Sequence, residues 1–425
     1  MRVQVSSPAE HQGLLELPIA DRLETWVDRR VKIGTDGAHR HIVRYLELAD
    51  HLYVVKELPE HLAEREYTLL RHLNTASIPS VEPVAVVTDR GTHADGEGLL
   101  VTRHLDFSLP YRRLFVGQVS IPQLRDQLLD ALVGLLVRAH LAGFFWGDCS
   151  LSNTLFRRDA GALSAYIVDV ETGEHHEQLS DGQRSFDLTI AMENFLGGLF
   201  DLQAAGKVPE SVDAVATAQA LGERYEALWA EVTNSETFGP TERYRVAQRI
   251  ARVNELGFDV VELEVTSNPS GDRIRLTPRV VENGFHGPKL ASLTGLRTQE
   301  NQARRLLNDI RQFGAYQTRS LPESVVAVRW LEQVFDPAIA AIPMDLADRL
   351  EPAEVYHQLL EHRWFLSEAR GFDVGMEETI RSYVRDVLPF VSGGRIVQDM
   401  ATAQLPVITT DTPAVGADGV EPGAG

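Results

Sequence analysis

Three polar side chains in the middle of the chain have the chemistry and the spacing of a magnesium site beside a proton acceptor. In FFWGDCSLSNTLF, residues 144–156, Asp148 lies five positions before Asn153, and apolar residues flank the pair on both sides. Asp169 follows 16 residues after Asn153, at the exit of the apolar run 166–168. Magnesium prefers oxygen ligands, and a protein usually supplies only one or two of them, with phosphates and water completing the set. The pattern favours Asn153 and Asp169 as metal ligands at the ends of two hairpin strands, with Asp148 accepting a proton from an attacking hydroxyl.

The same three side chains would also suit ordinary turns and a strand end, and the N-terminal half of the chain distinguishes the two interpretations. In LYVVKELPE, Lys56 and Val55 face opposite sides of a predicted strand. Glu66 lies three, four and seven positions before leucines of the helix predicted over 61–73, so its carboxylate is on the apolar face and needs a cation. Only four of the 41 cationic residues are lysines, and a lysine is a compact charge suited to phosphate oxygens. We therefore predict that Lys56 pairs with Glu66 and binds phosphate.

Along the chain the five residues follow the order Lys56, Glu66, Asp148, Asn153 and Asp169. This ordered set resembles the core set of the protein-kinase-like superfamily. The resemblance implies a kinase that uses ATP and Mg²⁺, with Lys56, held by Glu66, on the phosphates and Asp148 as the catalytic base. It covers about residues 30–205. More narrowly, the chain is similar to kinase-like proteins related to lipopolysaccharide core (Kdo/heptose) kinases that carry an uncharacterised C-terminal domain. The stretch FHGPKLASLTGLRTQENQARRLLNDI carries the similarity in the C-terminal part and implies no known activity.

The resemblance also assigns residues that support the site. WGDCSLSN stands where the superfamily has its catalytic loop, and IVDVE stands where it has its metal-binding aspartate motif. Asp187, in SFDLTIA, matches the buried aspartate that anchors the catalytic loop from a helix. Trp146 replaces the usual histidine of that loop, and its indole N–H can still donate a hydrogen bond. Glu171, in the Asp-Val-Glu motif, can add a second acidic metal ligand.

The nucleotide-binding residues implied by the resemblance come from two stretches. GLLVTRHLDFSLPYRRLF is similar to the hinge and the helix after it, which assigns Arg103 and Leu105 to nucleotide binding. IGTDGAHRHIV supplies Gly34 and Gly37 for a phosphate loop, although the full G-x-G-x-x-G pattern is not there.

The segment that follows the metal-binding motif is short. Only 17 residues separate Asp169 from Asp187, and no Ala-Pro-Glu signature lies between them. A full activation segment for protein substrates is therefore not expected. The predicted acceptor is a hydroxyl group on a small-molecule or atypical substrate.

The elements that must position these residues define a predicted α+β, bilobal protein-kinase-like fold, with a small β-rich N-lobe, a helical C-lobe and an additional mainly helical C-terminal domain. Short β-like runs dominate before residue 105, and leucines on more than one face of 121–143 indicate a central buried helix. FDVVELEVTSNPSGDRIRLTPRVV predicts a hairpin within the C-terminal part. The predicted divisions are a lead-in (1–30), the N-lobe (31–105), the C-lobe (106–230), a C-terminal domain with a β-hairpin and helices (231–400) and a disordered tail (401–425).

Composition narrows the range of partners and compartments. The 425 residues carry a net charge of −20, which disfavours bulk nucleic acid as a partner. No apolar run is long enough for a signal peptide or a transmembrane segment, so we expect a cytoplasmic protein. The single cysteine, Cys149, excludes an internal disulfide, and without an activating histidine nearby it is predicted to pack in the loop rather than act as a nucleophile.

Alternatives from other functional classes stay open on the sequence alone. The weak glycine loop and Trp146 also suit a nucleotide-binding pseudokinase whose C-terminal domain recruits a protein partner. An RNA-binding role for the C-terminal domain is opposed by the acidity of the chain, and the helix predicted over 300–313 is better explained as docked and amphipathic. The histidines at 39, 41, 175 and 176 lack metal-ligand spacing and are interpreted as polar loop residues, with His39 and Arg40 as possible phosphate contacts.

Overall fold

The computed structural model of the chain describes most of the first 234 residues and most of residues 285–391. The described residues are 1–7, 11–32, 41–48, 51–91, 96–114, 124–234, 236–238, 248, 256, 259–262, 274–276, 279–281, 285–315, 321–391 and 394.

The N-terminal unit is an antiparallel six-stranded sheet in the order β1-β5-β6-β4-β3-β2. Its strands are β1 (Arg2–Val5), β2 (Val31–Lys32), β3 (Ile42–Leu48), β4 (His51–Pro59), β5 (Glu82–Thr88) and β6 (Glu97–Arg103). The helix α1 (Glu60–Thr75) follows β4 directly and packs across β4, β5 and β6. The other face of the sheet is covered by two short 3-10 helices, η1 (Gln12–Glu16) and η2 (Leu23–Thr25), in one apolar cluster with the sheet.

Alternation along β4 and β6 decides which residues face α1. Val55 lies opposite Val101 and contributes to the cluster under the 3-10 helices, whereas Lys56 lies opposite Leu100, which packs on the α1 side. Residues directly opposite each other in an antiparallel pair share a face. The Lys56 side chain therefore lies on the face of the sheet covered by α1, as its position in the sequence predicts.

The second unit is helical around a small sheet. The long helices α3 (Leu124–Leu141), α4 (Asp181–Ala204) and α5 (Ala214–Thr233) pack on one another, and α2 (Tyr111–Leu114) precedes them. A three-stranded sheet, β10-β9-β7, lies beside α3, and β8 pairs with β11. These strands are β7 (Leu109–Pro110), β8 (Phe144–Phe145), β9 (Thr154–Asp159), β10 (Ala162–Ile167) and β11 (Glu174–His175). Gly143 ends the α3 segment with φ +74°, and a Cβ there would lie 2.1 Å from the His176 carbonyl oxygen, so only glycine fits.

The C-terminal domain is helical and has its own core. Its helices are α7 (His286–Thr294), α8 (Glu300–Ala315), α9 (Glu323–Trp330), the π-helical η5 (Leu331–Phe335), α10 (Asp336–Ala340), α11 (Met344–Ala347), α12 (Pro352–Arg370), α13 (Met376–Asp386) and the 3-10 turn η6 (Leu388–Phe390). Trp330, Tyr356 and Tyr383 are buried at its centre. The predicted helix over 300–313 is α8, and its apolar face docks on the rest of the domain.

The predicted hairpin in this part of the chain is only partly correct. Strand β13 (Asp259–Glu262) pairs with β15 (Arg279–Val281), as expected, but β14 (Ile274–Leu276) pairs with the earlier β12 (Glu236–Phe238). The alternating pattern identified strand residues, but it does not determine which partner each strand takes. The predicted tail, 401–425, lies outside the described residues.

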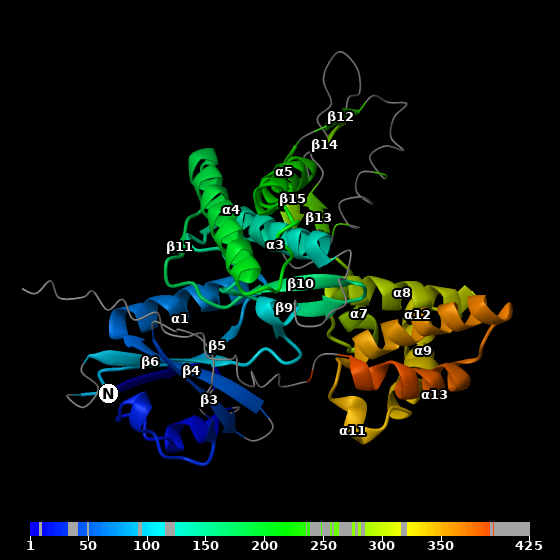
Figure 1. The fold of residues 1–425 in the computed structure, drawn as a ribbon, viewed down its shortest axis with the longest axis horizontal. Helices are drawn as coiled ribbons and strands as arrows, with labels where there is room; N and C mark the ends of the chain where they lie inside the picture. Colours follow the sequence, from blue (N-terminus) through cyan, green and yellow to red (C-terminus); the bar gives the residue numbers. More distant parts are fainter. Residues whose placement is uncertain are drawn as a thin grey trace, which may run out of the picture.

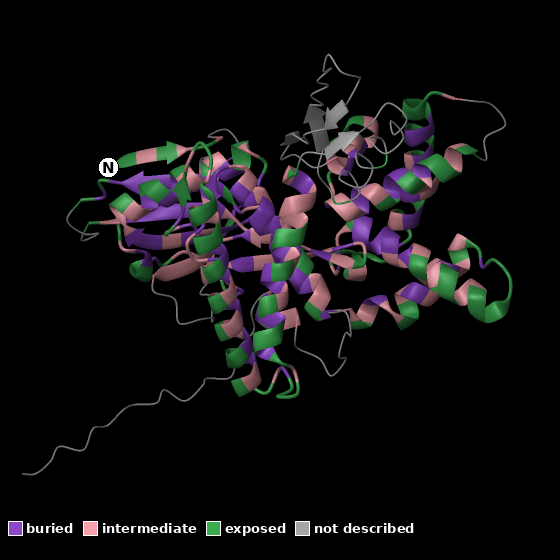
Figure 2. Cartoon of the chain, turned by 90° about the horizontal axis from the view of Figure 1, so that it is seen from above, coloured by how far each residue is buried: buried purple, intermediate pink, exposed green. Residues whose placement is uncertain are grey.

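The three units are arranged side by side, with the helical C-terminal domain against the strands β9 and β10 (Figure 1). Buried residues form the interior of each unit (Figure 2). One apolar cluster includes residues of α1 and of the helices of the second unit. The predicted α+β class, with a β-rich first lobe, a helical second lobe and a helical C-terminal domain, is confirmed. No helix among the described residues combines the length and apolarity needed to span a membrane.

Candidate active site

A lysine and two carboxylates from three separate elements meet between the two lobes. Lys56 on β4 donates from Nζ to Glu66 Oε2 on α1 at 3.0 Å and to Asp169 Oδ2, just after β10, at 2.9 Å. A third carboxylate, Glu171 Oε2, lies 3.8 Å from the same Nζ. The first two contacts join residues 10 and 113 positions apart in the chain, so they depend on the tertiary fold. The predicted pairing of Lys56 with Glu66 is present.

The balance of charge in this cluster shifts the pKa values of both Lys56 and Glu66. Burial alone would lower the pKa of Lys56, but Glu66 and Asp169 together raise that pKa above its ordinary value. Burial, reinforced by the Asp169 carboxylate, raises the pKa of Glu66 from 4.5 to about 7 against the opposing attraction of Lys56. The cluster carries more carboxylate than ammonium charge, so an added divalent cation would relieve it.

The raised pKa of Glu66 gives a pH-dependent prediction for the free protein. A carboxyl group whose pKa is higher in the folded than in the unfolded state costs stability progressively as pH rises from the unfolded to the folded pKa. In Glu66→Gln, Lys56 keeps its Asp169 partner, and we expect the stability of this variant relative to the wild type to increase as pH rises from 4.5 to about 7, by up to about 3 kcal/mol in total. Urea denaturation at several pH values measures this. The control is Glu64→Gln on the solvent side of the same helix, and a difference that does not grow with pH would contradict the prediction.

The catalytic-loop candidates Asp148 and Asn153 are in direct contact. Asn153 Nδ2 donates to Asp148 Oδ2 at 2.8 Å and to the Asp148 backbone carbonyl at 3.1 Å. Because the amide nitrogen faces Asp148, the amide oxygen of Asn153 is turned away from it, as a metal ligand requires. The second carboxylate oxygen of Asp148, Oδ1, accepts from Asn194 Nδ2 of α4 at 2.9 Å. Asp148 is thus oriented from two sides.

Asp187 anchors the backbone of this loop from within α4. Its carboxylate is fully buried and accepts from the backbone N–H groups of Trp146 and Gly147 at 2.7 and 2.8 Å. His140 Nε2 of α3 lies 3.0 Å from the same carboxylate, and the other ring nitrogen of His140 contacts the Tyr225 hydroxyl at 2.6 Å. This network fixes the loop that carries Asp148.

Trp146 connects the loop to the segment that carries Asp169. Its buried indole donates from Nε1 to the Asp169 backbone carbonyl at 2.9 Å, and its own carbonyl accepts from Thr172 Oγ1 at 3.0 Å. The indole N–H therefore finds a partner where the resemblance expects a histidine. Asp169 Oδ1 accepts from the Glu171 N–H at 3.0 Å, which tightens this turn.

The donor set fits a magnesium ion that completes its shell with phosphates and water. The available atoms are the carboxylate oxygens of Asp169 and Glu171 and the amide oxygen of Asn153, which are the hard ligands that Mg²⁺ prefers. Across the described parts of the chain, no group of three or more His, Cys, Asp or Glu side chains is arranged to hold a metal on its own. His41 Nε2 lies 3.3 Å from Glu171 Oε2, and the rings of His175 and His72 lie 3.6 Å apart at an interplanar angle of 51°.

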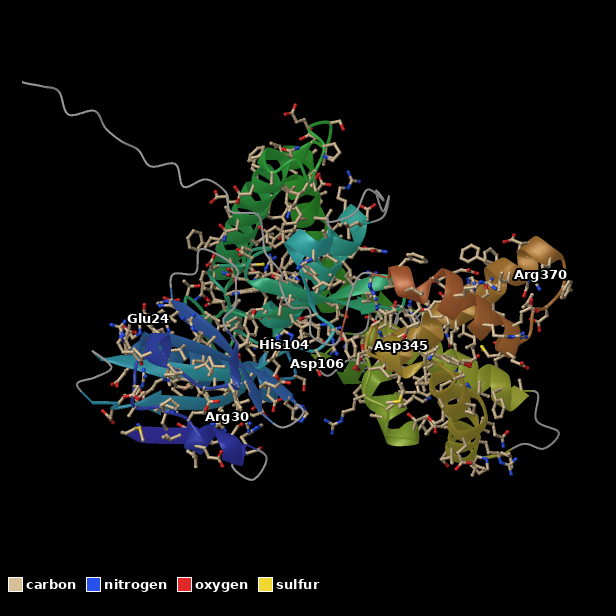
Figure 3. All side chains as sticks on the ribbon, turned by 60° about the horizontal axis from the view of Figure 1, so that its bottom comes forward. Glu24, Arg30, His104, Asp106, Asp345 and Arg370 are labelled. Atoms are coloured by element: carbon tan, nitrogen blue, oxygen red, sulfur yellow. The ribbon has the colours of Figure 1, made fainter. Side chains whose placement is uncertain are left out.

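Other residues assigned from the sequence lie elsewhere or outside the described parts. Arg103 is on the face of the sheet opposite to Lys56, where its guanidinium contacts His51 and Glu82, so its side chain does not reach the cluster. Leu105 lies in the connection between the lobes, beside His104 and Asp106 (Figure 3). Gly34 and Gly37 are outside the described residues. Cys149 is buried, and burial raises the pKa of its thiol well above the ordinary value, which disfavours a nucleophilic role.

Two residues of the site were missed in the sequence. Asn194 lies in AMENFLGG, where a helix pattern gives no sign that an amide faces the catalytic loop, and its position depends on how α4 packs. His140 lies in the last turn of the helix predicted to be buried, and a histidine among leucines was a usable signal for a buried polar partner.

This arrangement, a lysine–glutamate pair in a β-rich lobe facing an acidic and amide cluster in a helical lobe, defines a kinase-like unit. Residues 21–196 match the model of the lipopolysaccharide kinase (Kdo/WaaP) family, and residues 227–388 match a domain of unknown function (DUF4032). The predicted resemblance and the kinase-like fold are thereby confirmed. Among solved structures, the chain is similar to one described as "WaaP in complex with acyl carrier protein", with a TM-score of 0.34 and 16% identity, covering 60% of this chain and 99% of that one. No curated protein sequence matches the chain.

Proposed function

We propose that the chain is an ATP- and Mg²⁺-dependent kinase that transfers the γ-phosphoryl group to a hydroxyl of a small-molecule or atypical acceptor. The observation that carries this proposal is the contact of Lys56 Nζ with both Glu66 and Asp169, at 3.0 and 2.9 Å, within a kinase-like fold. The match to the lipopolysaccharide kinase family supports it.

Each residue of the site has a role in this proposal. Lys56, held by Glu66, orients the nucleotide phosphates, while Asn153 and Asp169 hold Mg²⁺. When bound, magnesium supplies neutralisation of the charge on the phosphate oxygens. Asp148, fixed by Asn153 and Asn194, positions the acceptor hydroxyl and takes its proton. Because the protein does little covalent chemistry in such a reaction, most of the rate enhancement comes from positioning and charge neutralisation.

The short stretch after Asp169 supports a small or atypical acceptor. Within 12 residues the chain forms β11, pairs it with β8 and begins α4 at Asp181. Ser180 caps that helix by accepting from the Gln183 N–H, so the stretch ends firmly there. Such a short connection leaves little chain from which to build a platform for a peptide. At the hinge, nucleotide contacts of Arg103 and Leu105 would come from the backbone, since the Arg103 side chain lies on the far face of the sheet.

Release of ADP by the purified full chain tests the proposed activity. We expect release that requires both Mg²⁺ and a hydroxyl-bearing acceptor, with fractionated small-molecule extracts serving as the acceptor pool. ADP release independent of any acceptor would indicate ATP hydrolysis instead. If Mg²⁺ and nucleotide raise the melting temperature but no fraction yields turnover, the chain is a nucleotide-binding pseudokinase, and the kinase proposal is wrong.

A further inference from the structure

The hairpin formed by β9 and β10 connects the candidate metal ligands to the C-terminal domain. Asn153 immediately precedes β9, and Asp169 lies two residues after the end of β10. The backbone N–H of Val168 donates to the Asn153 carbonyl at 3.1 Å, so the two ends of the hairpin are joined. The turn at the other end lies about 17 Å away, at roughly 3.3 Å per strand residue. Figure 1 shows this end of the hairpin against α7 and α8.

Asp159, the last residue of β9, is the main attachment to the C-terminal domain. Its side chain is about 1% exposed. It accepts from the backbone N–H of Gln302 at 2.8 Å, and from the backbone N–H and side-chain Nδ2 of Asn301 at 3.2 and 3.0 Å. Ser164 Oγ of the hairpin itself donates to the same carboxylate at 2.9 Å. If α8 moved away, this buried carboxylate would lose its hydrogen bonds from Asn301 and Gln302, and leaving it without those donors would be costly.

The turn of the hairpin is held by a second carboxylate of the C-terminal domain. Ala160 and Gly161 both have positive φ, 50° and 82°, which is the geometry of a two-residue hairpin turn. Alanine in this conformation is strained, and such strain persists only where the surroundings determine it. Here the Ala160 N–H donates to Glu354 Oε2 of α12 at 2.9 Å, and Gln302 Nε2 donates to the same oxygen at 3.2 Å.

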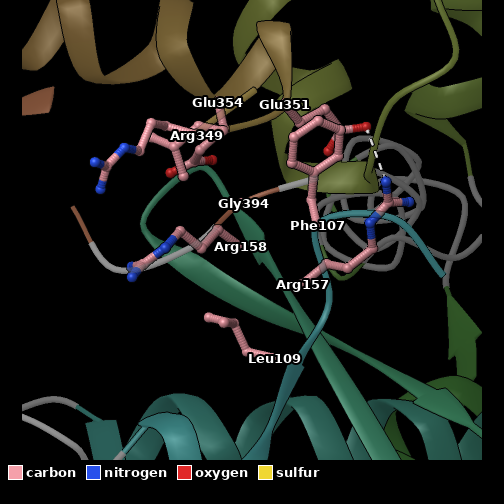
Figure 4. Close-up of a pocket in the computed structure, with 9 residues that line it drawn as sticks. Phe107, Leu109, Arg157, Arg158, Arg349, Glu351, Glu354 and Gly394 are labelled. Carbon is pink, nitrogen blue, oxygen red and sulfur yellow. Dashed lines mark hydrogen bonds and ion pairs between the residues drawn. The ribbon is translucent and has the colours of Figure 1, made fainter. Parts of the chain in front are cut away.

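The sides of the hairpin carry further contacts to the C-terminal domain. Tyr166 of β10 donates from its hydroxyl to Gln299 Oε1, immediately before α8. Arg157 of β9 lies 3.5 Å from Glu351 at the start of α12, beside a small pocket that both residues line (Figure 4). At its base, by contrast, the hairpin is attached to the N-lobe, where Ile167 N–H donates to Pro79 O and Val81 N–H donates to Ile167 O, at 3.0 and 2.9 Å.

We propose that the C-terminal domain is a positioning element for the active site, which holds the β9–β10 hairpin by its turn and thereby fixes Asn153 and Asp169 for metal binding. This inference rests on the proposed function for its catalytic consequence. Asp159 on the hairpin, together with Asn301, Gln302 and Glu354 on the C-terminal domain, are the positioning residues. Their contacts with one another lie at the turn of the hairpin, at the opposite end from Asn153 and Asp169, so they act through the hairpin.

The size of the effect follows from the strictness of magnesium coordination. Mg²⁺ demands near-ideal octahedral geometry, so a site whose ligands are not held in position binds it more weakly. Removing groups that hydrogen-bond directly to metal ligands typically costs about tenfold to a hundredfold in metal affinity, and for contacts at the far end of the hairpin we expect the lower end of this range, about tenfold. With the turn released, the hairpin would retain only its attachment at the base, and backbone hydrogen bonds along it would open more often.

The variant Asp159→Asn in the full chain tests the proposal, because the amide keeps the shape but faces its former donors with an N–H₂ group. The matched control is Asp373→Asn, which removes an exposed carboxylate of the C-terminal domain that pairs with Arg363. Two quantities are measured: hydrogen exchange of backbone amides in 154–167, and the Mg²⁺ concentration that half-saturates stabilisation by a non-hydrolysable ATP analogue. We expect faster exchange in the hairpin and a Mg²⁺ requirement about tenfold higher, with turnover restored by excess Mg²⁺.

Specific results would overturn the proposal. Unchanged hairpin exchange, or faster exchange with an unchanged Mg²⁺ requirement, would show that the contacts only join the domains. If Asp159→Asn does not fold, Gln302→Ala removes the side-chain bonds to Glu354 and Arg158 O more mildly, and the same two measurements decide. If the wild type binds no nucleotide with Mg²⁺, the proposed function fails, and the positioning role for metal binding fails with it. Exchange in the hairpin would then report only whether the C-terminal domain holds it.

Discussion

Replacing Asp148 with asparagine is expected to lower phosphoryl transfer by a factor of about 100 to 10,000 while nucleotide binding persists. An amide cannot take the proton of the acceptor hydroxyl. It also disturbs the positions of its neighbours, because Asn153 Nδ2 and Asn194 Nδ2 each donate to one carboxylate oxygen at 2.8 and 2.9 Å. An asparagine at 148 would present one N–H₂ group to one of these donors.

The measurement for Asp148→Asn combines acceptor-dependent turnover with the shift in melting temperature caused by nucleotide and Mg²⁺. The control is Asp181→Asn, an exposed carboxylate in the first turn of α4, which should retain both properties. Turnover within a few-fold of the wild type would exclude Asp148 as the catalytic base. Loss of the nucleotide-induced shift together with turnover would place Asp148 among the nucleotide-binding residues instead.

Replacing Lys56 with methionine is expected to weaken nucleotide binding by about tenfold to a hundredfold, the value of a hydrogen bond to a charged group, and to destabilise the free protein in a pH-dependent way. Lys56 is the ammonium group between Glu66, Asp169 and Glu171. Removing one partner of a buried ion pair typically costs about 3–5 kcal/mol. Since the pKa of Glu66 is already raised to about 7, protonation of Glu66 at lower pH should recover part of this loss.

A double variant separates the two consequences of losing Lys56. We expect Lys56→Met with Glu66→Gln to regain much of the stability at pH 8, because no buried carboxylate at position 66 is left without its cation, while nucleotide binding stays lost. Urea denaturation and calorimetric titration with an ATP analogue measure the two properties. Lys289→Met is the control, since Lys289 forms an exposed pair with Glu323 in the C-terminal domain. Nucleotide affinity unchanged by Lys56→Met would remove Lys56 from the site.

The residues that bear charge against an apolar background were predictable from the sequence. A glutamate on the packing face of a helix must find a cation, and the side of the strand that Lys56 occupies follows from alternation. The order of Lys56, Glu66, Asp148, Asn153 and Asp169 then pointed to a kinase-like family, which the match over residues 21–196 confirms.

What the sequence did not predict depends on packing between distant elements. Asn194 reaches Asp148 only because α4 lies against the catalytic loop, and the Arg103 side chain is directed away from the site by the register of β4 and β6. The attachment of α8 to Asp159 joins residues more than 140 positions apart. An aspartate in a turn is ordinary in a sequence, and only its burial reveals that it binds another domain.

Lys56 and two oxygen ligands are expected to surround a magnesium-bound triphosphate, and calorimetric titration of a non-hydrolysable ATP analogue measures whether they do. The titration is made with and without Mg²⁺ on the wild type and on Asp169→Asn. The wild type should bind the analogue tightly only with Mg²⁺, and replacement of Asp169 should abolish that Mg²⁺ dependence. Equal affinity with and without the metal, or an Asp169→Asn variant that responds to Mg²⁺ as the wild type does, would contradict this expectation.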